Sequence, residues 1–245
     1  MNNLFNMDGP LFRFLSKVAD LMILNIIFLI SCIPIVTIGA SVTALSYVTL
    51  KMKDGEEGYV FKTFFRSFRE NFKQSTLIWL LMLLLAVVMV VDFLIIGNME
   101  GTMSMVMKVL VGMGALIWLM EFTYVFPLQS RFYNTIRQTL QNALLLSIAN
   151  FPKTLCMMAV TIIAVLATMW NSYTVWYGLL VWILLGFAVI SWINSHFFYG
   201  IFKKLMPDQE EEQETEEGEL SPEMEAVRTK TEEIPENGGK SGEIR

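Results

Sequence analysis

Long apolar runs alternate with short polar stretches along most of the chain, and the first of them, residues 21–50, carries no charge. This run exceeds the roughly 20 apolar residues that an α-helix needs to cross a bilayer. Pro34 interrupts the run, because proline lacks a backbone donor and clashes with the preceding helical turn, and Gly39 follows it. Two interpretations stay open: a single kinked crossing, or two helices joined by a tight turn.

The same pattern, followed along the chain, predicts an all-α fold. We expect a polytopic transmembrane helix bundle in residues 1–206, with five or six membrane segments and two amphipathic cytoplasmic helical linkers. Each linker combines aromatic or aliphatic positions at helical spacing with basic residues. The expected membrane segments are 11–33, 38–52, 76–97, 103–128, 154–170 and 175–200, and the linkers are 59–75 and 130–150.

The two halves of the first run differ in the size of their side chains. Residues 21–33 are mostly bulky, whereas residues 39–49 are rich in glycine, alanine, serine and threonine. Small residues let helices approach closely within a membrane. We therefore expect the second half to be buried in protein, and we expect Asn25, the one amide of the first half, to bond to a neighbouring helix.

The linker 59–75 carries an aromatic stripe and a basic stripe about 100° apart around the helix. This arrangement is typical of a helix that lies in an anionic membrane surface or packs within the protein. The alternative is a helix that docks a cytoplasmic partner. The contact residues predicted on this helix are Phe61, Phe64, Phe65 and Phe68 in the aromatic stripe and Lys62, Arg66, Arg69 and Lys73 in the basic stripe.

Four ionisable residues that could form charge pairs lie within the apolar segments: Asp92, Lys108, Glu121 and His196. Asp92 and Lys108 flank the turn 97–102 at similar depth, so we expect a salt bridge, because an unpaired charge is costly in lipid. Snorkelling to the surface and an ion or proton pathway are the alternatives. Glu121 lies roughly level with His196, and a contact between them is a hypothesis.

The net charge of −5 hides an uneven distribution. Residues 1–206 hold 14 basic and 9 acidic residues, whereas residues 207–245 hold 4 basic and 14 acidic residues. The acidic C-terminal tail has almost no aromatic residues, so we expect it to be disordered. The basic residues of the body adjoin apolar runs, where lipid headgroups account for them. The lipid bilayer is therefore an expected partner, and nucleic acid is not.

Motifs that carry chemistry are scarce. Cys32 and Cys156 lie in apolar runs, His196 is the single histidine, and no spacing typical of metal ligands occurs. The sequence contains no G-x-S-x-G, H-E-x-x-H or P-loop motif. We therefore expect no metal, no cofactor and no enzymatic activity, although a hydrolase that uses carboxylates alone stays open.

The distribution of basic residues predicts the orientation. They cluster in both linkers and at 203–204, whereas the turns 97–102 and 171–174 contain none. The positive-inside rule then places the linkers and the C-terminus in the cytoplasm. A hairpin in the first run would leave Arg13 and Lys17 inside as well, whereas a single crossing would leave them outside. The charges therefore favour the hairpin.

Three stretches resemble the YesL-like family, a domain of unknown function in bacterial integral membrane proteins. They are CIPIVTIGASVTALSYVTLK from residue 32, DGEEGYVFKTFFRSFRENFKQSTLIW from residue 54 and TIRQTLQNALLLSIANFP from residue 135. The resemblance covers most of residues 1–200. It implies a multi-pass protein of the bacterial plasma membrane, often encoded near carbohydrate ABC-transport systems, and it supplies no catalytic residues.

The expected function is an accessory or scaffold component associated with a carbohydrate transport system. ABC-transporter components or other membrane proteins are then its expected partners. The alternative is a small transporter in its own right that uses the intramembrane charges Asp92, Lys108 and Glu121.

Overall fold

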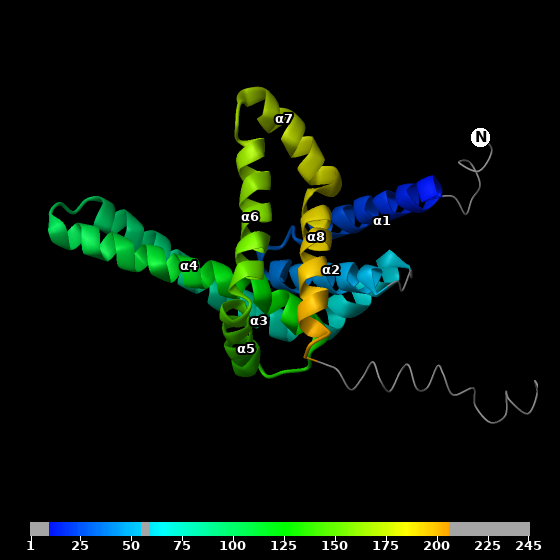
Figure 1. The fold of residues 1–245 in the computed structure, drawn as a ribbon, viewed down its shortest axis with the longest axis horizontal. Helices are drawn as coiled ribbons and strands as arrows, with labels where there is room; N and C mark the ends of the chain where they lie inside the picture. Colours follow the sequence, from blue (N-terminus) through cyan, green and yellow to red (C-terminus); the bar gives the residue numbers. More distant parts are fainter. Residues whose placement is uncertain (1–9, 55–58, 206–245) are drawn as a thin grey trace, which may run out of the picture. The chain divides into compact units, whose positions relative to one another are not determined.

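The computed structural model describes residues 10–54 and 59–205, and every regular element in this part of the chain is a helix (Figure 1). The all-α fold predicted from the sequence is therefore confirmed. The predicted acidic tail, residues 207–245, lies outside the described residues. The helices are α1 Pro10–Ser31, α2 Ile38–Lys53, α3 Val60–Gly97, α4 Thr102–Arg131, α5 Ile136–Ala149, α6 Phe151–Thr168, α7 Ser172–Val181 and α8 Phe187–Phe202, with the 3-10 turn η1 Ile35–Thr37 and the π-helix η2 Trp182–Gly186.

The first apolar run forms two helices, α1 and α2, joined by a tight turn at Pro34. The Thr37 hydroxyl closes this turn, because it lies 2.6 Å from the carbonyl oxygen of Ser31 and 2.7 Å from that of Pro34. Trp79 of α3 donates its ring N–H to the carbonyl of Ile35 at 2.9 Å. The backbone groups that proline frees thus find partners at once, and the run is a helix–turn–helix hairpin, as the charge pattern predicts.

Helix α2 is largely buried, as its small residues predict. At Gly39 the backbone of α2 approaches α3 so closely that a Cβ would lie 2.5 Å from Trp79 Cβ and against the Ser75 carbonyl. Thr43 donates its hydroxyl to that of Ser75 at 2.9 Å. The α2–α3 contact therefore depends on glycine and hydroxyl residues, the usual means of close helix packing in membranes.

Helices α3 and α4 form a long hairpin (Figure 1). α3 has 38 residues and is about 57 Å long at 1.5 Å per residue. It joins the predicted linker 59–75 and the predicted segment 76–97 into one continuous helix. Gly101, whose φ of 96° lies in the region that favours glycine, ends the connection to α4.

Local signals start the later helices. Thr135 and Gln138 form a capping box at the start of α5, and Asn171 and Thr174 form another at the start of α7. The short connection between α6 and α7 turns the chain back on itself (Figure 1), and α7 continues through η2 into α8. The predicted linker 130–150 thus becomes the end of α4, a short extended stretch and the separate helix α5.

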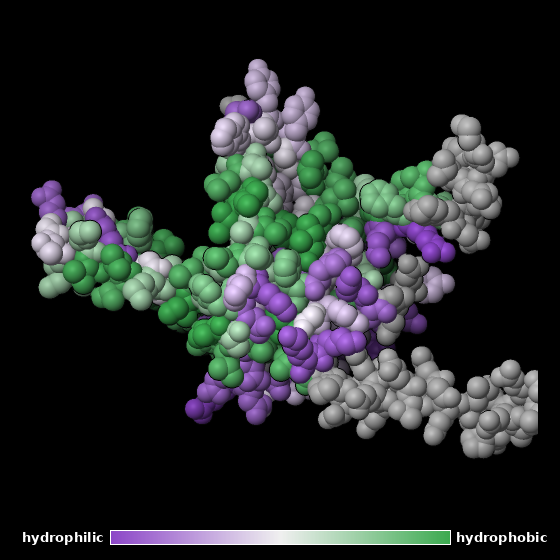
Figure 2. Space-filling view, in the orientation of Figure 1, coloured by the Kyte–Doolittle hydropathy of each residue, from purple (hydrophilic) through white to green (hydrophobic). Residues whose placement is uncertain are grey.

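Six helical segments of the described residues are long and apolar enough to cross a membrane. Figure 2 shows hydrophobic residues along the α3–α4 hairpin and α6, with paler or hydrophilic residues at the hairpin tips. This distribution is typical of a multi-pass membrane protein. The six segments are Leu11–Ser31, Ile35–Lys53, Val60–Gly97, Thr102–Arg131, Phe151–Thr168 and Tyr173–Phe202.

Candidate functional site

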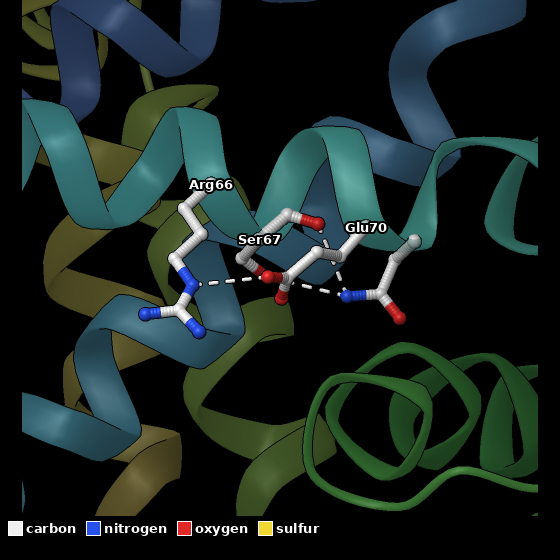
Figure 3. Close-up of polar contacts among 4 residues, drawn as sticks. Arg66, Ser67 and Glu70 are labelled. Carbon is white, nitrogen blue, oxygen red and sulfur yellow. Dashed lines mark hydrogen bonds and ion pairs between the residues drawn. The ribbon is translucent and has the colours of Figure 1, made fainter.

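The N-terminal half of α3 exposes a row of basic side chains. This basic face consists of Lys62, Arg66, Arg69 and Lys73, all of which are exposed. Arg66 Nε donates to Glu70 Oε1 at 2.9 Å (Figure 3). An exposed pair of this spacing contributes only about 0.3–0.5 kcal/mol, so a stronger anionic partner can displace it. The basic stripe predicted from the sequence therefore lies on the surface.

The neighbouring aromatic row is divided between the interior and the surface. Phe64 is 0% exposed and packs in a core formed with α1 and α2, whereas Phe61 is 61% exposed. Phe65 and Phe68 are half-buried, with ring centroids 5.5 Å and 6.2 Å from that of Phe64. Helix α3 is thus anchored through Phe64, while Phe61 remains on the surface near the basic face.

Asp92 and Lys108 lie at the same level of the α3–α4 hairpin but form no ion pair. The Ser104 hydroxyl of α4 donates to the carbonyl of Ile96 of α3 at 3.2 Å. Asp92 lies one helical turn from Ile96, and Lys108 lies one helical turn from Ser104. Both charged side chains are exposed, and no ion pair in the described residues includes either one. The structure thus shows no salt bridge between them, and the snorkelling alternative fits their exposure.

Glu121 and His196 also remain apart. Glu121 is half-buried on α4, whereas His196 is exposed on α8, and its Nδ1 lies 2.9 Å from the carbonyl oxygen of Trp192. No hydrogen bond or ion pair within the described residues joins Glu121 to His196, because the histidine ring is held against its own helix, 4.7 Å from the Trp192 ring. The described residues contain no group of three or more His, Cys, Asp or Glu that could hold a metal ion.

A cavity of about 480 Å³, called the inner cavity below, lies between α2, α4, α6 and the η2–α8 segment. Its volume lies within the roughly 300–1,000 Å³ typical of ligand pockets. No charged side chain is found among the described residues that line it. The aromatic side chains of the lining are Phe28, Trp79, Phe122, Phe126, Trp182, Phe187 and Phe198.

Helices α2 and α8 supply a polar patch in the inner cavity. The Thr49 and Ser191 hydroxyl oxygens lie 2.9 Å apart and share a hydrogen bond. Ser46, one turn before Thr49, is 7% exposed and also lines the cavity. Asn194, one turn after Ser191, has a buried amide oxygen with no partner among the described residues. An unpaired amide oxygen therefore lines a mainly apolar cavity, whereas buried polar groups are normally hydrogen-bonded.

Asn25 holds one wall of the inner cavity in position. This residue is fully buried, and its amide group donates to the carbonyls of Trp182 at 2.9 Å and Ile183 at 2.7 Å. The backbone N–H of Ala188 donates back to Asn25 Oδ1 at 3.0 Å. A π-helical turn disturbs the regular ladder of backbone bonds, and Asn25 supplies partners there. The predicted bond from Asn25 to a neighbouring helix is confirmed.

Sequence reasoning identifies the small residues of α2 but misses the inner cavity. Ser191 and Asn194 are not singled out, although polar residues within an apolar segment are a signal of function or of buried contacts. Which of them meet α2 depends on how α2 and α8 cross, and hydrophobic periodicity carries no information about that crossing.

Comparison with known families supports the resemblance seen in the sequence. The family model described as "Protein of unknown function, DUF624" matches residues 21–93, which include α1, α2 and most of α3. YesL-like proteins belong to that family, so the predicted resemblance is confirmed. Neither the curated proteins nor the solved structures contain a match to the chain.

Proposed function

We propose that this chain, whose residues 21–93 match the DUF624 family model, is an accessory or scaffold component of a carbohydrate transport system. The proposal assigns no catalytic step to the chain. Its main support is the basic face of α3, which stays exposed while Phe64 fixes the opposite side of the helix in the core. Arginine and exposed aromatic residues are common anchors of protein interfaces. The partner is therefore a transport component with an acidic cytoplasmic surface.

Charge reversal on the basic face tests this proposal. The change is Arg66→Glu with Arg69→Glu, and the matched control is Arg137→Glu, an exposed arginine on α5. The full chain and its associated proteins are isolated from the native host in mild detergent and identified by mass spectrometry. We expect an ABC-transport component to accompany the wild type and the control and to be lost from the double variant. Equal recovery from all three, or a chain isolated alone from the wild type, would contradict docking through this face.

The proposed site of action requires the basic face to lie in the cytoplasm of a bacterium. The six apolar helices and the positive-inside rule support both termini on the cytoplasmic side. In a background with both native cysteines replaced by serine, Asn3→Cys should resist an impermeant thiol reagent added to intact cells. Asn98→Cys, beyond the end of α3, should react and serves as the positive control. Strong labelling at position 3 would place the N-terminus outside.

A small transporter is the second candidate, and the unpaired intramembrane charges favour it. Asp92 and Lys108 lack an ion-pair partner among the described residues, and Glu121 is half-buried. Sugar flux into liposomes reconstituted with the full chain would measure this activity. Flux that is absent, or that is unchanged by Glu121→Gln and Asp92→Asn, would remove the basis of this candidate.

A further inference from the structure

We propose that the inner cavity binds a neutral lipid with one acyl chain and a hydroxyl-bearing head, of the monoacylglycerol class. This site is independent of the docking function, because its lining residues lie on other surfaces than the basic face of α3. Three properties of the cavity lead to this ligand class: its opening, its polar patch and its lack of charge.

The inner cavity is partly open and lies among helices long and apolar enough to cross a membrane. Leu119 of α4 and Ile162 of α6 line the cavity, and both are large apolar residues with exposed side chains. In a membrane these exposed faces contact acyl chains, so a ligand can enter sideways from the lipid. The interior beyond this opening is mainly aromatic and aliphatic, which favours an acyl chain through burial of apolar surface.

The volume limits the size of the ligand. If each non-hydrogen group occupies roughly the 30 Å³ of a liquid water molecule, a cavity of about 480 Å³ holds about 16 such groups. This number suits a small head with most of one chain, whose end remains in the bilayer. A phospholipid with two long chains would have to leave most of both chains outside this space.

The polar patch determines the chemistry of the head. Asn194 offers an amide whose buried oxygen has no partner among the described residues, and Ser46 adds a hydroxyl to the lining. A hydroxyl group of the ligand both donates and accepts, so it can satisfy a serine hydroxyl and either atom of an amide. No basic residue among the described lining residues could compensate a carboxylate or phosphate, and burying an unpaired charge is expensive. The cavity therefore selects a neutral head over an anionic one.

Photocrosslinking of the full chain in phosphatidylcholine vesicles tests the proposal. The probe is a monoacylglycerol that carries a diazirine on its acyl chain, and the labelled peptides are identified by mass spectrometry. We expect labelling at α4, α6 or α8 residues of the cavity, and competition by unlabelled monoolein. Oleic acid, which shares the chain and has an anionic head, should compete at least about fivefold less well, because the loss of matched hydrogen bonds and the burial of charge both oppose it.

Two pairs of variants separate a built site from general contact with lipid. Ile162→Trp fills the cavity mouth, whereas Ile163→Trp changes the adjacent residue, which is 64% exposed and lies outside the lining. Ser46→Ala with Asn194→Leu removes two polar side chains of the lining, and Asn98→Leu is its control at an exposed position. We expect labelling of the double variant to fall about fivefold or more, the effect of losing two neutral hydrogen bonds. Labelling of Ile162→Trp should fall because the indole takes the space of the probe, and labelling should stay unchanged in each control.

Some results would overturn the proposal. Equal labelling of Ile162→Trp and Ile163→Trp would mean that the probe does not occupy the cavity. Equal competition by monoolein, oleic acid and lysophosphatidylcholine would mean that the cavity accepts any acyl chain and does not recognise the head. The Ile162 and Ile163 changes are at lipid-facing positions, so both proteins should fold, and their comparison remains decisive if the polar double variant does not.

Discussion

Replacement of Asn25 by leucine should destabilise the contact between α1 and the η2 segment. Leucine has as many side-chain non-hydrogen atoms as asparagine, but its methyl groups are larger and cannot hydrogen-bond, so the change removes the bonds and crowds the backbone groups that Asn25 contacts. The wild-type side chain makes three bonds of 2.7–3.0 Å, to the carbonyls of Trp182 and Ile183 and from the N–H of Ala188. Side-chain hydrogen bonds between membrane helices are worth about 0.6–1.7 kcal/mol each, so the three together give an expected loss of about 2–5 kcal/mol.

Unfolding of the full chain in mixed micelles of dodecyl maltoside and increasing sodium dodecyl sulfate measures this loss. Far-ultraviolet circular dichroism follows the helices, and tryptophan fluorescence follows the region around Trp182. The control is Asn98→Leu, in which the asparagine replaced is exposed and bonds only to the carbonyl of Leu94. The control should unfold like the wild type. An unfolding free energy for Asn25→Leu within about 0.5 kcal/mol of the wild type, the usual range for surface substitutions, would refute the role assigned to Asn25.

Two further predictions concern the α1–α2 hairpin. Gly39→Ala should lower the unfolding free energy by about 1–3 kcal/mol through overpacking, because its Cβ would meet the Ser75 carbonyl. Gly112→Ala is the control and should not lower it, because a Cβ at Gly112 meets open space. Equal stability of the two variants would contradict the close approach at Gly39. Burial raises the pKa of the Cys32 thiol to about 11, and a hydrogen bond from Ser41 offsets part of the increase. In a Cys156→Ser background, maleimide should therefore react slowly with Cys32 at pH 7. The reaction rate should rise about tenfold per pH unit toward pH 9, because the thiolate is the nucleophile. A rate at pH 7 equal to that of a free thiol would contradict the burial of Cys32.

The positions at which helices break could be predicted in part from the sequence. Pro34 ends α1 as expected, because proline removes a donor whatever surrounds it. The sequence predicts a boundary between an amphipathic linker, 59–75, and an apolar membrane segment, 76–97, because the composition changes there. A change in side chains does not interrupt backbone hydrogen bonds, however. No proline or glycine lies between Val60 and Ile96, so α3 continues as one helix. Breaks in the backbone and changes of environment are therefore separate properties of the sequence.

The candidate site was harder to predict from the sequence, because it depends on the directions in which side chains project from the helix axes. The equal depth of Asp92 and Lys108 follows from the rise per residue, yet their side chains are both exposed and form no pair. The burial of Asn25 could be predicted because a lone amide among bulky apolar residues needs a partner. The meeting of Thr49 with Ser191 could not, because it requires the crossing of two helices separated by most of the chain.

Several polar residues of the apolar helices join one helix to another. Thr43 bonds to Ser75, Thr49 to Ser191, and Tyr124 to Thr154 at 2.9 Å in each case. Within lipid such pairing is expected, because no water is present to satisfy a polar group. Asn194, a lining residue of the inner cavity, departs from this behaviour, because its buried amide oxygen has no partner among the described residues beside a volume large enough for a ligand. Thr76 Oγ1 and Trp192 Nε1 are also buried without a partner but lie outside the lining. It is therefore the combination of an unpaired amide oxygen with an adjoining cavity that points to a ligand.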